Sequence, residues 1–483
     1  CIHRSGCVRV FIYGLFFGFA SYALFNYWLL KFHPLAIFIV PIIYALYFLI
    51  LFPALKIADT LFPKYGYLLQ AVIWVGYEYL KSKGFLGYTY GTLGYTQYPF
   101  LPLIRISSIF GVWGVSFLVV YPSAFIGNAL KNGVKGVASF VRQHRIGLFA
   151  YGGVFILAVI FGIAAKADLQ DSKRWRVALI QHNVDPWKHD YEDALHILID
   201  LSEQAVRQNP DIVVWSETAF VPAIDYHTKY RRNRETYELV RNLKEFLAGQ
   251  NVPYVIGNDD GVLKRVGREE RIDYNAALLF ENGEITERYW KTHLVPFTEH
   301  FPFEKQFPRI YKMLIEADTH FWEKGTEYTV FEAGGVKFST PICFEDTFGY
   351  LSREFIRNGA EVIVNLTNDS WSFSVAAEMQ HMTMAVFRAV ENRRSVVRST
   401  NGGITCIIDP NGRISARIPP FTEGYLVDNA VVYTDTTTLY TKWGDWFGLV
   451  LLVTGLCFLA GGGLTRIMKY RKIRRTEGDA HGG

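Results

Sequence analysis

Long apolar runs with little charge fill residues 8–166 and return at 445–463, whereas residues 167–440 have the composition of an ordinary globular protein. A helix needs about 20 apolar residues to cross the hydrocarbon core of a bilayer. We predict spans at 9–30, 34–55, 66–82, 108–130, 147–166 and 445–464, of which the third is the weakest because it contains Glu78. The chain therefore predicts an α-helical transmembrane bundle and a separate polar domain.

Three segments follow from this pattern. Residues 1–166 form an N-terminal transmembrane bundle of about five spans, 167–444 a polar domain, and 445–483 a last span with a basic tail. Because the sequence begins at Cys1 rather than Met, we expect an incomplete N-terminus. The first apolar run shows no signal-peptide cleavage site and precedes further spans, so we expect it to stay as an anchor.

Positive charges collect at alternate ends of the predicted spans. Lys and Arg precede the first span, separate the second from the third, fill the link before the fifth and follow the last in "RIMKYRKIRR". Cytoplasmic loops carry an excess of these residues. Alternating spans put all four groups on one side, so we predict that this side is cytoplasmic and that 167–444 faces outward.

Charge and cysteine usage exclude several classes of function. A net charge of +5 over 483 residues is small, and no basic stripe is interleaved with aromatic residues, so nucleic acid is not an expected partner. The five cysteines show no CxxC spacing and the histidines no metal-ligand spacing. We therefore expect no disulfide framework, no metal site and no other cofactor.

Within 167–444, short β-rich runs alternate with helical stretches, which predicts an α/β domain with helices covering sheet faces. Glu217 follows "DIVVWS", Lys291 follows "ITERYW" and Cys343 follows "VKFSTPI", each at the carboxyl end of a predicted strand. Ligands of open α/β sheets bind outside such strand ends. A carboxylate base and an ammonium can together activate a thiol, although each residue alone has an ordinary structural explanation.

The sequence motifs around these residues are a more specific signal than the residues alone. "VVWSE", "RYWKTHLVPFTEHFPF" and "TPICFED" occur in the order Glu, Lys, Cys, and in this respect the chain resembles the carbon–nitrogen hydrolase (nitrilase) superfamily. That resemblance implies a nitrilase-type αββα sandwich for the polar domain. "NDSW", "RAVENRRSVVRSTNGGIT" and "IDPNGRI", with membrane spans on both sides, resemble the apolipoprotein N-acyltransferase family over nearly the whole chain.

The resemblance implies roles for individual residues. Glu217 would be the general base, Lys291 the stabiliser of thiolate and oxyanion, and Cys343 the nucleophile. Glu345 matches an acid that the family needs, and Glu299 matches a second acid that orients Lys291.

Two further positions concern the lining of the site. Asn275 matches an amide that lines it, and Phe344 departs from a Tyr that is common in the family. The alternative for Glu299 is a loop carboxylate on a mobile lid.

The aromatic loop 84–103, with Tyr88, Tyr90 and Tyr95, has two interpretations. It is either an interfacial aromatic belt or part of a lipid-accessible entrance. Trp187 is a further candidate for this substrate portal, in place of a substrate-side Trp of the family.

The implied reaction is acyl transfer from a phospholipid, through a thioester, to the α-amine of the diacylglyceryl-cysteine of a lipoprotein. The expected location is the bacterial cytoplasmic (inner) membrane, with 167–444 on the periplasmic side. Two alternatives stay open from the residues: a membrane-tethered amidase of small amides, and a non-catalytic lipoprotein-binding scaffold. The expected partners are a phospholipid donor, a diacylated apolipoprotein acceptor and membrane lipid.

Overall fold

The computed structural model describes residues 5–32, 36–185, 190–265, 268–316 and 319–480. The chain divides into two compact units. Unit 1 comprises Cys1–Ala165 and Asp445–Gly483, and unit 2 comprises Lys166–Gly444. The C-terminal helix thus belongs to the same unit as the N-terminal helices, although all of unit 2 separates them in sequence.

Unit 1 is helical. Its elements are α1 (Cys7–Phe25), α2 (Leu29–Phe32), α3 (Ala36–Leu61), α4 (Gly66–Lys81), η2 (Leu93–Gln97), α5 (Leu101–Ile104), α6 (Ser107–Phe110), α7 (Val112–Ala129), η3 (Leu130–Asn132), η4 (Val134–Gly136), α8 (Val137–Gln143), α9 (Arg145–Ala164) and α17 (Trp446–Ala480). Among the described residues, five helices are long and apolar enough to cross a membrane, and they lie in α1, α3, α7, α9 and α17. The remaining predicted span, 66–82, is α4, whose 16 residues fall short of that length.

α4 packs against α3, α7 and α17 and carries polar groups into the interior of unit 1. The Gln70 amide donates to the Leu55 carbonyl at 3.0 Å and accepts from Asn128 of α7 at 2.7 Å. At Gly76 a Cβ would lie 2.9 Å from the Leu452 Cα of α17, so only glycine allows this close approach. The short helix therefore packs among longer apolar helices, and its crossing of the membrane stays a prediction.

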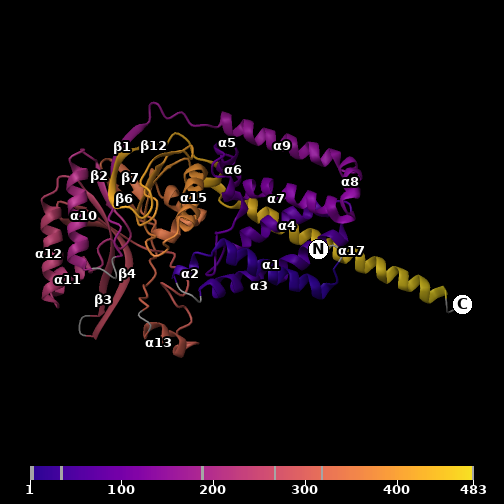
Figure 1. The fold of residues 1–483 in the computed structure, drawn as a ribbon, viewed down its shortest axis with the longest axis horizontal. Coiled ribbons are helices and arrows are strands. Elements are labelled where there is room, and N and C mark those ends of the chain that lie inside the picture. Colours follow the sequence, from indigo (N-terminus) through magenta and orange to yellow (C-terminus); the bar gives the residue numbers. More distant parts are fainter. Residues whose placement is uncertain (1–4, 33–35, 186–189, 266–267, 317–318, 481–483) are drawn as a thin grey trace. The chain divides into compact units, whose positions relative to one another are not determined.

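Unit 2 contains two six-stranded sheets within the described residues (Figure 1). The first has the order β12 (Gly424–Val432), β1 (Lys173–Gln181), β2 (Ile212–Trp215), β3 (Tyr254–Arg265), β4 (Arg268–Glu281), β5 (Glu284–Trp290). The second has the order β11 (Ile414–Arg417), β10 (Cys406–Ile408), β9 (Ser395–Asn401), β8 (Val362–Asn368), β7 (Val336–Ser339), β6 (Val330–Ala333). At the middle of each sheet three strands run parallel, namely β1–β2–β3 and β7–β8–β9.

The helices of unit 2 are α10 (Tyr191–Val206), α11 (Ile224–Tyr230), α12 (Arg234–Ala248), α13 (Pro308–Glu316), η5 (Cys343–Thr347), α14 (Gly349–Arg357), α15 (Val375–Asn392) and α16 (Leu439–Trp443). α10 and α12 bury Leu198 and Leu243 against the first sheet and lie beside it in Figure 1. The two sheets face each other, with the Trp175 and Phe338 rings 5.2 Å apart between them. This is the predicted nitrilase-type αββα sandwich, and its parallel strands deliver their carboxyl ends to a common edge.

Candidate active site

Lys291 lies immediately after β5, and its side chain is fully buried. Its Nζ is 2.7 Å from Glu299 Oε1 and 3.1 Å from Glu217 Oε1. Burial works to lower the pKa of Lys291, but the two carboxylates outweigh it and hold that pKa well above its ordinary value. The side chain is therefore a permanent buried cation at neutral pH.

Glu217 follows β2 by two residues, and its carboxylate is held from three directions. Oε1 accepts from Asn275 Nδ2 of β4 at 2.8 Å as well as from Lys291. Oε2 accepts from the backbone N–H of Asn368, at the end of β8, at 2.8 Å. Since Asn368 belongs to the second sheet, this bond ties the two sheets together at the site.

Cys343 begins the 3₁₀ turn η5 and has a φ of +51°, in the left-handed region that residues other than glycine rarely adopt. Backbone strain of this kind collects where a side chain must be aimed at a site. Burial and the Glu217 carboxylate raise the pKa of the thiol, and Lys291 opposes them only in part. The resting sulfur is thus a protonated thiol that needs a base.

Glu345 locks the turn of Cys343 to the segment that follows Lys291. Its Oε2 accepts from the Ile342 N–H at 2.8 Å, while Oε1 accepts from the N–H groups of Thr292 at 2.8 Å and His293 at 2.9 Å. The Thr292 hydroxyl and the Tyr289 hydroxyl donate to the same carboxylate. A fully buried acid that accepts so many bonds fixes backbone positions.

Glu299 and Phe344 are the remaining residues of unit 2 that the resemblance places at or beside the triad. Glu299 Oε2 accepts from the Val295 N–H at 2.8 Å, so the carboxylate is built into its own loop while Oε1 holds Lys291. Burial raises the pKa of Glu299, and Lys291 works against that rise. The Phe344 ring packs edge-on against Phe348, with the ring centres 4.9 Å apart.

The predicted portal tyrosines belong to unit 1, whereas the triad belongs to unit 2. Tyr88 stacks between Tyr44 and Tyr90, with ring centres 4.6 and 5.1 Å apart, and its hydroxyl donates to Asn26 at 2.7 Å. Tyr95 is buried in unit 1. Trp187 lies outside the described residues. The three tyrosines are therefore side chains of the helical unit.

Two features of the site were not predicted. The backbone N–H of Asn368 has no residue-type signature, although "NDSW" begins with this residue. His381 of α15 lies buried between Asp346 and Asp369, close behind the turn of Cys343. No distinct sequence signal pointed to it, because α15 also carries the charged residues Glu378, Arg388 and Glu391.

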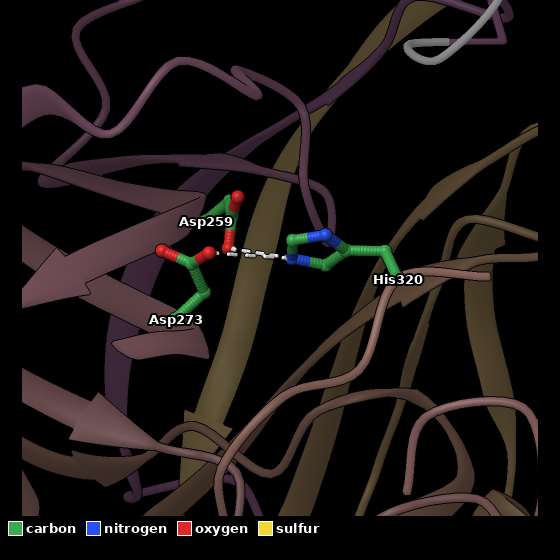
Figure 2. A group of neighbouring side chains, drawn as sticks. All are labelled: Asp259, Asp273 and His320. Carbon is green, nitrogen blue, oxygen red and sulfur yellow. Dashed lines mark ion pairs between the residues drawn. The ribbon is translucent and has the colours of Figure 1, made fainter. Parts of the chain in front are cut away.

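In the described part of the chain, one group has the residue types and spacing to hold a metal ion, and Figure 2 shows it. His320 points at Asp259 of β3 and Asp273 of β4, with Nε2–O distances of 3.6 and 3.8 Å. Arg271 forms ion pairs with both carboxylates, and the Trp322 N–H donates to Asp259 at 2.9 Å. Because an arginine already compensates both acids, the group is better described as an ion-pair cluster that holds the loop of His320.

Comparisons with known proteins agree over both units. The family model described as carbon–nitrogen hydrolase matches residues 176–437, and the model described as apolipoprotein N-acyltransferase N-terminal domain matches residues 1–125. Apolipoprotein N-acyltransferase 1 of Treponema denticola is 46% identical, covering 93% of this chain and 87% of its own length. The protein of the same name from Treponema pallidum is 42% identical, covering 97% and 89%. Apolipoprotein N-acyltransferase of Borreliella burgdorferi is 31% identical, covering 78% and 71%.

Proposed function

The chain belongs to the apolipoprotein N-acyltransferase family, and we propose that it moves an acyl chain from a phospholipid, through a thioester on Cys343, to the α-amine of the diacylglyceryl-cysteine of a lipoprotein. It is an N-acyltransferase whose substrates are lipids and lipoproteins. The observation that carries the proposal is the buried Lys291 ammonium, held between the carboxylates of Glu217 and Glu299. Lys291 also works to lower the pKa of the Cys343 thiol, against burial and Glu217.

In the first half-reaction Glu217 takes the thiol proton and the Cys343 sulfur attacks the ester carbonyl of the phospholipid. The Lys291 ammonium stabilises the oxyanion of the tetrahedral intermediate, and such electrostatic help is worth about 10²–10³-fold per donor. The C–O bond then breaks, the lysophospholipid alkoxide takes the proton from Glu217, and the acyl group stays on sulfur. Glu217 suits this role because its three donors hold the carboxylate in one orientation.

In the second half-reaction the lipoprotein amine attacks the thioester carbonyl. Glu217 accepts the amine proton, the C–S bond breaks, and the proton returns to the sulfur as the amide forms. General acid–base help of this kind contributes about 10²–10⁴-fold. Both steps use the same pocket, so the enzyme is regenerated with its thiol protonated.

The location follows from the spans and the substrates. We place the chain in the bacterial cytoplasmic membrane with unit 2 on the periplasmic side, where the positive charges at the span ends put it. Segment 293–322 contains α13, and exposed apolar side chains lie just before it at Phe307 and within it at Ile310 and Met313. A lid with an apolar surface suits lipid substrates and would keep water from the thioester. We base the proposed contribution of Tyr88, Tyr90 and Tyr95 to a lipid entrance on the aromatic composition of loop 84–103.

The test is the intact mass of the purified full chain after incubation with phospholipid alone. We expect one added acyl group on the wild-type protein and on Cys406→Ala, whose cysteine is buried in β10, and none on Cys343→Ala. Addition of a diacylated lipopeptide should then remove the group and yield the triacylated product. An unmodified wild-type protein, or an adduct that persists in Cys343→Ala, would contradict the proposal.

The amidase alternative has weaker support, because the relatives reported above carry the N-acyltransferase name over most of their length. It predicts ammonia release from small soluble amides without transfer to an amine, which the same preparation can be assayed for.

A further inference from the structure

A closed cluster of four charged side chains lies buried behind the turn of Cys343. His381 Nε2 is 2.9 Å from Asp346 Oδ1, and His381 Nδ1 is 3.1 Å from Asp369 Oδ1. Arg398 of β9 forms an ion pair with Asp346 and lies 3.6 Å from Asp369. All four side chains are at most 6% exposed, and the charges alternate around the ring.

The geometry fixes the protonation of the histidine. Ionised carboxylates only accept hydrogen bonds, and both ring nitrogens of His381 face a carboxylate. Both nitrogens must therefore donate, which only an imidazolium can do. Burial works to lower the pKa of His381, but Asp369 and Asp346 raise it to about 9.

The neighbouring acid, Glu378, adds no charge to the cluster. Glu378, one turn earlier on α15, faces Asp369 and accepts from the Ser372 hydroxyl. Burial and Asp369 raise the pKa of Glu378 to about 10, so it is a neutral acid at physiological pH. The cluster consequently contains two anions and two cations.

The cluster joins the two backbone segments that supply the chemistry. Asp346 belongs to η5, the turn that Cys343 begins. Asp369 follows Asn368, whose N–H donates to Glu217 Oε2 at 2.8 Å. A side chain that bonds both aspartates therefore sets the spacing between the nucleophile and the base's backbone donor.

We propose that His381 is a positioning residue of the acyl transfer: by donating from both ring nitrogens, it holds the turn of Cys343 and the N–H of Asn368 in register with Glu217. The inference rests on the proposed roles of Cys343 and Glu217. It assigns a function to a buried charge outside the proposed triad. A buried ion pair is weak evidence for net stability, so the role proposed for this cluster is a geometric one.

The test is the rate of thioester formation in His381→Asn, measured by intact mass against phospholipid concentration. An asparagine amide donates from one side only, so one aspartate loses its donor. Misplacement by about 1 Å costs up to about 100-fold in rate, and we expect a 10- to 100-fold lower maximal rate with an unchanged KM. Ser395→Ala is the matched control, because Ser395 loses a buried 2.6 Å bond to the Val431 carbonyl at the opposite end of β9.

Maximal rates of His381→Asn and Ser395→Ala within twofold of wild type would overturn the inference. Failure of the proposed function is distinct, because the wild-type protein would then form no adduct. If His381→Asn does not fold, Asp369→Asn replaces it. That variant keeps an oxygen acceptor for Nδ1, and we expect a smaller loss of maximal rate, whereas an unchanged rate counts against the inference.

Nitrogen-15 spectra of histidine-labelled wild-type protein test the premise that both ring nitrogens of His381 donate. The His381 ring, assigned by its shift in Asp369→Asn, should show both nitrogens protonated at pH 7.5. One unprotonated nitrogen would overturn the proposal.

Discussion

Lys291 is buried together with two carboxylates, so removing its positive charge should lower the free energy of unfolding. In Lys291→Met both Glu217 and Glu299 lose their cation while they remain buried. Breaking a buried ion pair costs about 3–5 kcal/mol of unfolding free energy, so we expect a loss of that size together with loss of thioester formation. Denaturant unfolding and intact mass measure the two effects.

The control for this variant is Lys244→Met. Lys244 pairs with the exposed Glu284 at 3.1 Å, and exposed pairs contribute about 0–1 kcal/mol. Equal destabilisation by the two variants would show that Lys291 is not held as a buried cation.

At the residue scale, strand ends were enough to predict that Glu217 and Lys291 lie together, and the structure places their charged atoms 3.1 Å apart. Their catalytic roles remain a proposal. The donors around Glu345 and the cluster around His381 could not be predicted, because they depend on backbone N–H groups and on contacts between distant segments. Such contacts leave no local pattern in a single sequence.

At the scale of elements, β3 comes unusually close to the segment that carries Glu217. A Cβ at Gly257 would lie 2.2 Å from the Ser216 carbonyl oxygen and 2.7 Å from the Glu217 Cα. We expect Gly257→Ala to cost about 1–3 kcal/mol through overpacking and to lower thioester formation, because the segment must move. Gly249→Ala, where the nearest atom is 3.4 Å away, should leave the thioester rate unchanged.

The loop after α13 is held by a titrating group. The nearby Asp259 carboxylate raises the pKa of His320, with Asp273 acting in the same direction and Arg271 and burial against it. A histidine with a raised pKa stabilises the loop fully below its unfolded pKa of about 6.5, and that contribution is lost as pH rises through the folded pKa. We therefore expect α13 to become easier to cleave at high pH.

Trypsin cleavage after Arg309 and Lys312 measures this effect, once normalised to a free peptide of the same sequence. In His320→Gln the normalised rate should be high at every pH. A wild-type rate that does not change between pH 6 and pH 9 would contradict the prediction.

Glycine-containing turns made two hairpins of unit 2 predictable from the sequence. The Asn282-Gly283 and Gly334-Gly335 turns join β4 to β5 and β6 to β7, as the glycines indicate. α4 was predicted as a span because its composition is apolar, and the proposed topology counts it as a crossing helix although its 16 residues are fewer than those of the five long apolar helices. The strained turn at Cys343 has no such sequence signal, since cysteine does not favour a positive φ.

At the scale of the whole molecule, the proposed topology can be mapped by labelling single cysteines. With the five native cysteines replaced, Asp171→Cys should react with an impermeant maleimide in spheroplasts. Lys135→Cys, in the link between α7 and α9, should react only after lysis. Both positions are exposed, so the opposite pattern would reverse the assigned orientation.

The division into two units also sets an order of events during biosynthesis. α17 fills the side of α4 at Gly76, yet the ribosome makes it only after all of unit 2. On the proposed topology, unit 2 must be exported while the membrane bundle still lacks α17 and the face of α4 at Gly76 is uncovered. A nascent chain that stops before Asp445 would therefore carry a complete unit 2 on a membrane bundle that lacks its last helix.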